Sequence, residues 1–127
     1  MKHLTLMEKY PVNVKTILKS DTDKKTTDEI IAYLQSKIDA HPVATYIATF
    51  DHYAHTKSLE KGEINKTFSD AKNIIFCFGV QIPKAEMLAI RPRSIGVVET
   101  EESFVISFMD APNPQAHQLI IEWIESI

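Results

Sequence analysis

Hydrophobic residues recur at helical spacing in the segment that follows residue 26. The stripe comprises Ile30, Ile31, Leu34 and Ile38. Thr26 precedes it and Glu29 lies three residues further on, which is the spacing of a capping box at a helix start. We expect this helix to end near Ala40, because the next residue precedes Pro42 and is biased out of helical geometry.

Two other segments favour helices. Asn113 and Pro114 provide an N-cap followed by proline at the first helical position. The apolar stripe after them comprises Ala116, Leu119, Ile120, Trp123, Ile124 and Ile127. We also interpret the residues after Pro11 as a short helix that runs into a polar loop at residues 20–25. Its apolar residues are Val12, Val14, Ile17 and Leu18.

Two later runs are rich in β-branched and aromatic residues. Residues 43–50 place Tyr46 and Phe50 on one face and Val43 and Ile47 on the other, which predicts a strand partly covered on both sides. Residues 73–82 form the most apolar run in the chain, and we expect them to be the central strand of the sheet.

Residues 88–99 and 104–111 predict a hairpin around Thr100 and Ser103. If these two residues pair, one face of the hairpin is apolar along its length and ends in an ion pair at its rim. The pairs in this register are Val97 with Ile106, Ile95 with Phe108 and Arg93 with Asp110.

The order of elements predicts an α+β fold, with an antiparallel sheet of four to five strands and helices packed on one face. A parallel sheet is disfavoured because no helix of adequate length separates the expected strands. The 127 residues contain no repeat and no linker of biased composition, so we expect residues 1–127 to form one domain.

Charge is distributed unevenly along the chain. Residues 1–93 hold every lysine and arginine, whereas residues 94–127 carry six acids and neither lysine nor arginine. The first segment is therefore net positive and the second net negative. Opposite charges attract within one fold or between copies of it, and we expect a homodimer. Lysines diluted by acids argue against nucleic-acid binding. No apolar run approaches the ~20 residues of a membrane helix, so we expect a cytoplasmic protein with no membrane partner.

Histidines offer one candidate site. His52 and His55 lie within the run Asp51–His55, and His41 is a third imidazole that could join them on a metal or a haem iron. On a helix the first two would share a face, but on a strand they point to opposite sides. We expect a strand leading into a loop here, and therefore polar surface histidines, with the metal site as the alternative.

Arg91 and Arg93 are the only arginines in the chain. Two residues apart on an extended segment, they project to the same side and are suited to clamping one anionic ligand. The alternative is structural, because the predicted register pairs Arg93 with Asp110 and leaves Arg91 at the sheet edge. Of the two arginines, Arg91 is therefore the one that we expect to be more available to a ligand.

Residues 80–88 are either a connector between strands or a lid over a ligand-binding cavity lined by Tyr46, Phe50 and Met87. Cys77, between two phenylalanines, is expected to be a buried small hydrophobe rather than a nucleophile. Only three glycines are available, so no phosphate-binding loop or dinucleotide fingerprint can be formed.

Two stretches carry a resemblance to other proteins: HPVATYIATFDH at residues 41–52 and KNIIFCFG at residues 72–79. With them, the whole chain resembles small conserved bacterial proteins of unknown function. This resemblance implies no activity, no cofactor and no catalytic residue.

These observations favour a non-enzymatic α+β domain that binds a small ligand or a partner and self-associates. Two alternatives stay open. One is a metal- or haem-binding protein that uses His52 and His55. The other is an enzyme that holds a small anionic substrate with Arg91 and Arg93 and uses one of the same histidines as acid or base.

Overall fold

The computed structural model of the protein describes residues 1–127. Its strands are β1 (Lys2–Leu6), β2 (Tyr10–Leu18), β3 (Thr45–Phe50), β4 (Phe68–Cys77), β5 (Arg93–Thr100) and β6 (Ser103–Met109). Its helices are α1 (Thr27–Ala40), α2 (His52–Ser58) and α3 (Pro114–Glu125), with short 3-10 turns η1 (Lys19–Asp21) and η2 (Ala85–Ile90).

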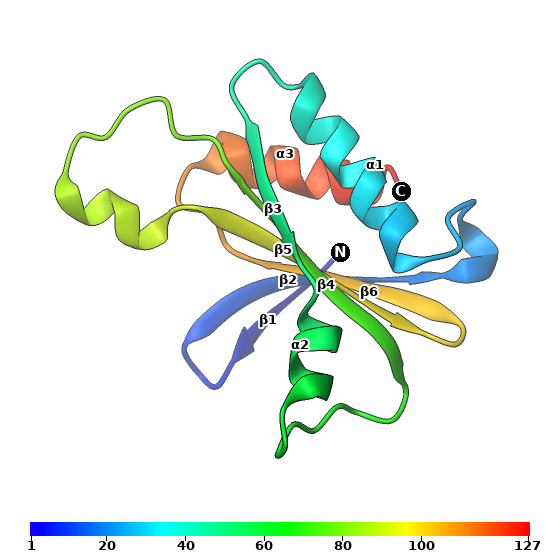
Figure 1. The fold of residues 1–127 in the computed structure, drawn as a ribbon. Helices are drawn as coiled ribbons and strands as arrows, with labels where there is room; N and C mark the ends of the chain where they lie inside the picture. Colours follow the sequence, from blue (N-terminus) through cyan, green and yellow to red (C-terminus); the bar gives the residue numbers. More distant parts are fainter.

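The strands form a single antiparallel sheet in the order β1-β2-β6-β5-β4-β3, and α1 and α3 lie together on one of its faces (Figure 1). The predicted α+β class is confirmed. The sheet has six strands rather than four to five, because the segment before residue 20 adds β1 and β2 to the edge of β6.

The prediction of a short helix after Pro11 is wrong. These residues form β2, which pairs with β6 from Val12 opposite Met109 to Leu18 opposite Ser103. The irregular spacing of its apolar residues hid the strand, since Val12 and its neighbour Asn13 are both buried on opposite faces. Hydrogen bonds to a strand about ninety residues away decide the conformation here.

Both capped helices form as predicted. Thr26 Oγ1 accepts a hydrogen bond from Glu29 N at 3.2 Å, and α1 ends at Ala40. The carboxylate of Glu29 accepts from Lys25 N at 2.6 Å, so the capping box closes one residue earlier than usual. In α3, Asn113 Oδ1 caps the first turn.

The predicted hairpin register is also confirmed. Val97 lies opposite Ile106, and Thr100 Oγ1 accepts from Ser103 N at 3.0 Å across the turn. Strand β5 begins only at Arg93, because residues 85–90 form η2 instead of extending the strand.

The hydrophobic core lies between the sheet and the helix pair. Its fully buried side chains come from α1, from the inner strands and from α3. They include Ile30, Leu34, Ile38, Ile74, Phe76, Ile95, Val97, Phe104, Ile106 and Ile124. Each such side chain stabilises the fold by about 1.5–3 kcal/mol relative to exposure, so the two predicted stripes of isoleucine and leucine are core positions.

Strand β4 is not central, since β5 and β6 occupy the middle of the sheet. It also ends at Cys77 rather than at Ile82. Beyond that point Val80 and Ile82 are 74% and 69% exposed. The segment from Phe78 to Ile90 projects away from the sheet as the light green to yellow lobe of Figure 1.

Strand β3 lies at the outer edge of the sheet and is more exposed than predicted, with Ile47 and Phe50 49% and 41% accessible. It contains a bulge between Tyr46 and Ala48. A loop was expected after this strand, but the residues that follow Phe50 form helix α2 instead. Asp51 Oδ1 accepts a hydrogen bond from Ala54 N at 2.9 Å and caps its first turn.

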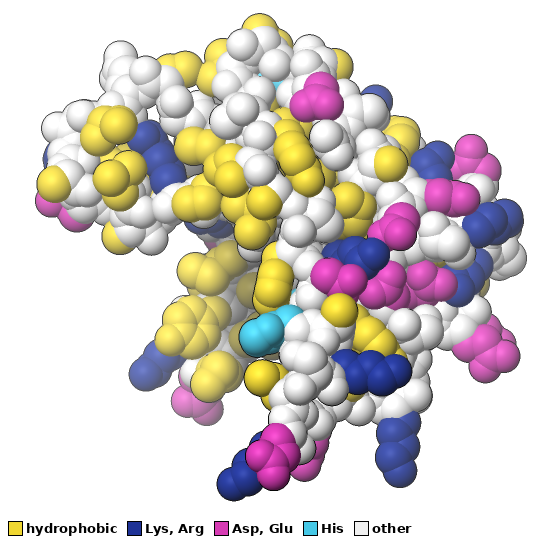
Figure 2. Space-filling model, viewed as in Figure 1, with side chains coloured by type: hydrophobic (Ala, Val, Ile, Leu, Met, Phe, Trp, Pro, Cys, Tyr) yellow, Lys and Arg dark blue, Asp and Glu magenta, His cyan; other side chains and the backbone are white.

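Several acids of the C-terminal third bind bases of the N-terminal third. Glu99 accepts from Lys19 at 2.7 Å and Glu125 from Lys15 at 3.0 Å. The opposite charges of the two parts of the chain are therefore partly neutralised within one fold. Figure 2 shows charged side chains gathered around the loop before α1, and hydrophobic ones along β3 and on the projecting lobe.

None of the helices combines the length and the apolar character needed to cross a lipid bilayer.

Candidate functional site

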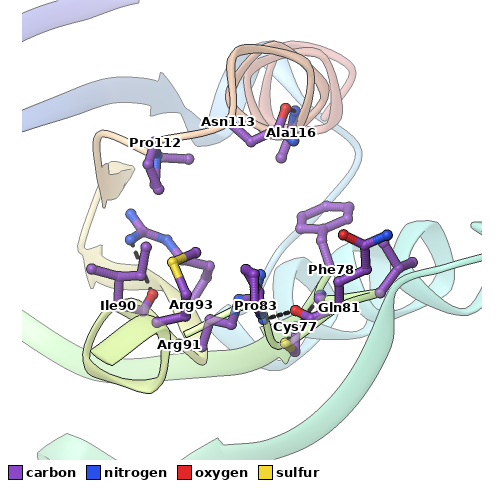
Figure 3. Close-up of a pocket in the computed structure, with 14 residues that line it drawn as sticks. Cys77, Phe78, Gln81, Pro83, Ile90, Arg91, Arg93, Pro112, Asn113 and Ala116 are labelled. Atoms are coloured by element: carbon purple, nitrogen blue, oxygen red, sulfur yellow. Dashed lines mark hydrogen bonds between the residues drawn. The ribbon is translucent and has the colours of Figure 1, made fainter. Parts of the chain in front are cut away.

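A cavity of about 420 Å³ lies beyond the end of β4, between the projecting lobe and the start of α3 (Figure 3). One wall carries the two arginines with Gln81 and Pro83. Pro112, Asn113 and Ala116 lie across the opening from them. Three separate stretches of the chain thus meet at one cavity, and a volume of this size is typical of small-molecule sites.

Arg91 holds the lobe together. Its Nη1 donates to the backbone oxygen of Gln81 at 2.5 Å, which joins the two ends of the projecting segment. The guanidinium also lies flat against Gly79, where an added Cβ would be only 2.9 Å from Nη1. Only one of its N–H groups bonds to protein, so most of its five donors stay free for a ligand.

Arg93 is fixed by backbone carbonyls. Its Nη2 donates to the oxygens of Met109 and Asp110 at 2.5 and 2.8 Å, and Nη1 lies 3.5 Å from the oxygen of Ile90. Burial lowers the pKa of Arg93, and the nearby charge of Asp110 partly opposes this shift. An arginine stays protonated at neutral pH under such a shift, so the pocket keeps this positive charge.

The predicted ion pair between Arg93 and the carboxylate of Asp110 is wrong. That carboxylate turns away and accepts from Asn13 Nδ2 at 2.8 Å and from His3 Nε2 at 3.2 Å. Burial opposes its ionisation, but the bonds from Asn13 and His3 outweigh burial and leave the pKa of Asp110 below its ordinary value. Arg93 and Asp110 are neighbours, as the register predicts, but the contact is a hydrogen bond from the guanidinium to the backbone oxygen of Asp110.

No acidic side chain lines the cavity, and neither arginine forms an ion pair within 4 Å. The rest of the lining is largely apolar and includes Phe78, Met87 and Ile90. The cavity therefore combines two guanidiniums that lack a bound carboxylate with a hydrophobic surface. This arrangement suits an anionic group attached to an apolar body.

The N-terminus of α3 also borders the cavity. Asn113 Oδ1 accepts from Gln115 N at 2.9 Å and from Ala116 N at 3.2 Å. Because the cap already uses these two N–H groups, the arginines are the charged donors that border the cavity.

The predicted ligand-contacting residues divide between two places. Met87 lines the cavity together with Arg91 and Arg93, but Tyr46 and Phe50 do not. Tyr46 packs against the core and its hydroxyl lies 2.8 Å from Thr49 Oγ1. Residues 80–88 belong to the lobe that forms one wall of the cavity, so this segment is more than a connector between strands.

Helix α2 places His52 and His55 three residues apart on one helical face. Their rings lie 5.3 and 5.6 Å from the ring of Phe50. The prediction that they point to opposite sides is wrong, because it assumed extended backbone.

His41 is held elsewhere. Its Nδ1 accepts from Val43 N and Ala44 N, both at 3.1 Å, and its ring packs edge-on against Phe78 and Trp123. His41 is therefore not part of a site with the histidines of α2. The structure contains no cluster of three or more metal-ligating side chains.

Cys77 is half-buried at the end of β4 and lines the cavity. Its Sγ accepts from Gly79 N at 3.3 Å. Phe78 and Gly79 were not expected to line the cavity, because the strand was predicted to continue to residue 82. The glycine and the proline that follow within six residues of Cys77 were the available indication that the strand ends here.

Comparison with protein families decides the relationship of this chain. It matches, over residues 1–127, the family described as "Family of unknown function (DUF6858)". The chain belongs to this DUF6858 family. The expected resemblance to conserved proteins of unknown function is therefore confirmed. Comparisons of the DUF6858 chain with curated proteins and with solved structures gave no match.

Proposed function

We propose that this DUF6858 protein binds a small molecule with an anionic group on an apolar body, in the cavity between the projecting lobe and α3. The observation that carries the proposal is the state of the two arginines. Arg91 and Arg93 bond only to backbone carbonyls, border a cavity without an acidic lining residue, and stand beside apolar side chains.

The two arginines have different parts in this proposal. Arg93 has three of its five donors on carbonyls and acts as a fixed positive charge. Arg91 keeps a free edge of its guanidinium and forms the bidentate contact with a carboxylate or phosphate. The apolar part of the ligand packs against Phe78, Met87 and Ile90.

The lining favours binding over catalysis. Apart from the arginines, Cys77 is the only titratable side chain among the lining residues. General acid–base catalysis needs a group with a pKa near neutrality within hydrogen-bond reach of the substrate. The histidines suggested for that role, His52 and His55, lie on α2 and do not line the cavity.

A thermal-shift experiment with paired probes tests the proposal. Phenylacetate and octanoate are compared with their neutral amides, phenylacetamide and octanamide, and with inorganic phosphate. We expect the two carboxylates at saturation to raise the Tm by about 5 °C, and we expect the amides and phosphate alone to have smaller effects.

Matched variants locate the effect. Arg91→Gln removes the free guanidinium and is expected to abolish the shift, whereas Lys66→Gln removes the same charge from an exposed site away from the cavity and leaves it intact. Equal stabilisation by amides and carboxylates, or a shift that persists in Arg91→Gln, contradicts an anion site in this cavity.

One observation favours a second candidate function. His52 and His55 share a helical face beside Phe50, which is the geometry that two imidazole ligands of one metal ion require. We propose metal binding here as the alternative. Titration with Zn²⁺ tests it, because His52→Ala should weaken binding while His41→Ala leaves it unchanged, and equal binding by all three proteins excludes it.

A further inference from the structure

The sheet has a second face, opposite α1 and α3. Side chains alternate along each strand, and the pairing registers place one set of positions from all six strands on this open face. These are Lys2, Leu4, Leu6, Tyr10, Val12, Val14, Thr16, Leu18, Ser103, Val105, Ser107, Met109, Ser94, Gly96, Val98, Thr100, Phe68, Ala71, Asn73, Ile75, Cys77, Thr45, Ala48 and Phe50.

The open face is almost free of charge. Lys2, at the outermost strand, is its only charged side chain in a chain in which 24% of residues are charged. The face of an antiparallel sheet that meets only water is normally lined by polar and charged residues. Here large apolar residues occupy the rims, with Leu6, Tyr10 and Met109 on one side and Phe50 on the other.

The middle of this face is uncovered. Gly96 pairs with Asn73 on one side and Ser107 on the other, so small side chains form the central row. The atoms nearest to a Cβ added to Gly96 would belong to these two neighbours, at 3.5 Å and beyond. Helix α2 packs near the β3–β4 end of this face, where the rings of His52 and His55 lie beside Phe50. A glycine inside a strand often marks a place where another backbone comes close.

We propose that a second copy of this chain covers the open face, so that two sheets pack face to face in a two-fold dimer. A two-fold interface brings each patch against an identical patch. A surface of one sign would repel its own copy, whereas this uncharged face is compatible with itself. This interface lies on the sheet and goes beyond the proposed ligand-binding function of the cavity.

The size of the face fits such a dimer. Six strands about 4.8 Å apart, each with about seven paired residues at ~3.3 Å, give a face of roughly 25 by 23 Å, or about 600 Å² in projection. This area is of the same order as the ~800 Å² per partner of a standard interface. Exposed apolar patches of several hundred Å² on one protein mark interaction sites.

The sheet edges are less suited to self-association. The bulge between Tyr46 and Ala48 interrupts the regular hydrogen-bonding edge of β3. At the other edge β1 is short and carries Lys2. Both features disfavour pairing of edge strands between copies, so the dimer is expected to use the face.

Sedimentation velocity between 1 and 100 µM tests the proposal with three variants that add one negative charge each. Gly96→Glu and Ser94→Glu place it on the open face, whereas Gln118→Glu places it on the exposed side of α3. We expect a dimer for the wild type and for Gln118→Glu, and a dissociation constant at least ~100-fold larger for the two face variants.

Two results overturn the proposal: a wild-type monomer at 100 µM, or a dimer that neither face variant weakens. In the monomer case, binding of a hydrophobic dye that Gly96→Glu abolishes would assign the face to a different occupant. If Gly96→Glu does not fold, Ser94→Glu decides, because Ser94 is exposed. The phenylacetate shift should persist in folded face variants, so this test is independent of the cavity.

Discussion

Glu99 accepts two hydrogen bonds from Thr27, from the backbone N–H at 2.8 Å and from the hydroxyl at 2.9 Å. Thr27 is fully buried at the first turn of α1, and Glu99 lies on β5. This contact fixes the start of the helix on the sheet. Lys19 Nζ bonds the other carboxylate oxygen at 2.7 Å, so three segments are joined by one side chain.

The substitution Glu99→Gln keeps an acceptor for Thr27 but removes the charge that Lys19 binds. Loss of a charge-assisted hydrogen bond is expected to lower the free energy of unfolding by about 1–3 kcal/mol. Urea denaturation measures the change. Glu101→Gln on the exposed turn is the control, and an equal effect of both substitutions contradicts the linking role of Glu99.

The same carboxylate predicts a dependence of stability on pH. Burial opposes the ionisation of Glu99, but the bonds from Lys19 and Thr27 outweigh burial and hold its pKa below the ordinary value of 4.5. Because the folded protein is the weaker proton acceptor here, Glu99 stabilises the fold above pH 4.5 and loses this contribution as the pH falls through its lowered pKa.

We therefore expect the wild-type free energy of unfolding to fall between pH 5 and pH 3, and to fall less steeply in Glu99→Gln. Residual dependence remains in the variant, because the pKa values of Asp110 and Glu125 are also lowered. Identical slopes for the two proteins would show that the Glu99 contact does not favour the charged form.

Gly79 controls the position of Arg91 in the cavity. A methyl group on Gly79 would lie 2.9–3.2 Å from three guanidinium atoms and displace them. The guanidinium is the end of a flexible chain, so Gly79→Ala is expected to change stability by less than ~1 kcal/mol but to weaken phenylacetate binding about tenfold. Isothermal titration measures the affinity.

Arg91→Lys serves as the companion variant to Gly79→Ala. It keeps the charge and loses the planar fork that binds both carboxylate oxygens. We expect a similar loss of affinity, and full retention of phenylacetate binding by both variants contradicts the assigned contact.

The single tryptophan can report on the cavity. Trp123 stacks on Phe78 with ring centroids 5.5 Å apart, and Phe78 lines the cavity. Occupancy by an apolar ligand is expected to shift the fluorescence of Trp123, because it alters the environment of the stacked pair. Phe78→Leu should reduce the shift, and an unchanged spectrum at a ligand concentration that raises the Tm contradicts this coupling.

Local sequence patterns predicted the elements whose conformation is decided locally. Thr26 and Asn113 cap helices by bonds to residues two or three positions away. The turn between Thr100 and Ser103 likewise fixes the register of its own two strands. In each case the deciding interactions lie within one segment, and the spacing of residues in the sequence displays them.

Strand β2 and helix α2 could not be predicted in the same way. The polar side chain of Asn13 can be buried in β2 because its amide donates a hydrogen bond to the carboxylate of Asp110. No local sequence pattern reveals this partner. For α2, Asp51 was an available N-cap, but the preceding alternation of residues 43–50 favoured continued extension.

The candidate site was predicted in part. The spacing of Arg91 and Arg93 predicted that both side chains face one site, and both line the cavity together with Met87. The opposite wall comes from Pro112 and Ala116, which follow β6 and reach the lobe only through the sheet topology. Tyr46 was assigned to the cavity because alternation alone cannot tell which apolar residues join the core.

The strand order has a consequence for folding of the nascent chain during its synthesis on the ribosome. β2 receives its inner neighbour, β6, only when residues 103–109 have left the exit tunnel, since Val12 pairs with Met109. Until then the β1–β2 hairpin lacks the strand that joins it to the rest of the sheet. A nascent chain halted before residue 100 is therefore expected to be digested readily by protease, whereas the released chain resists.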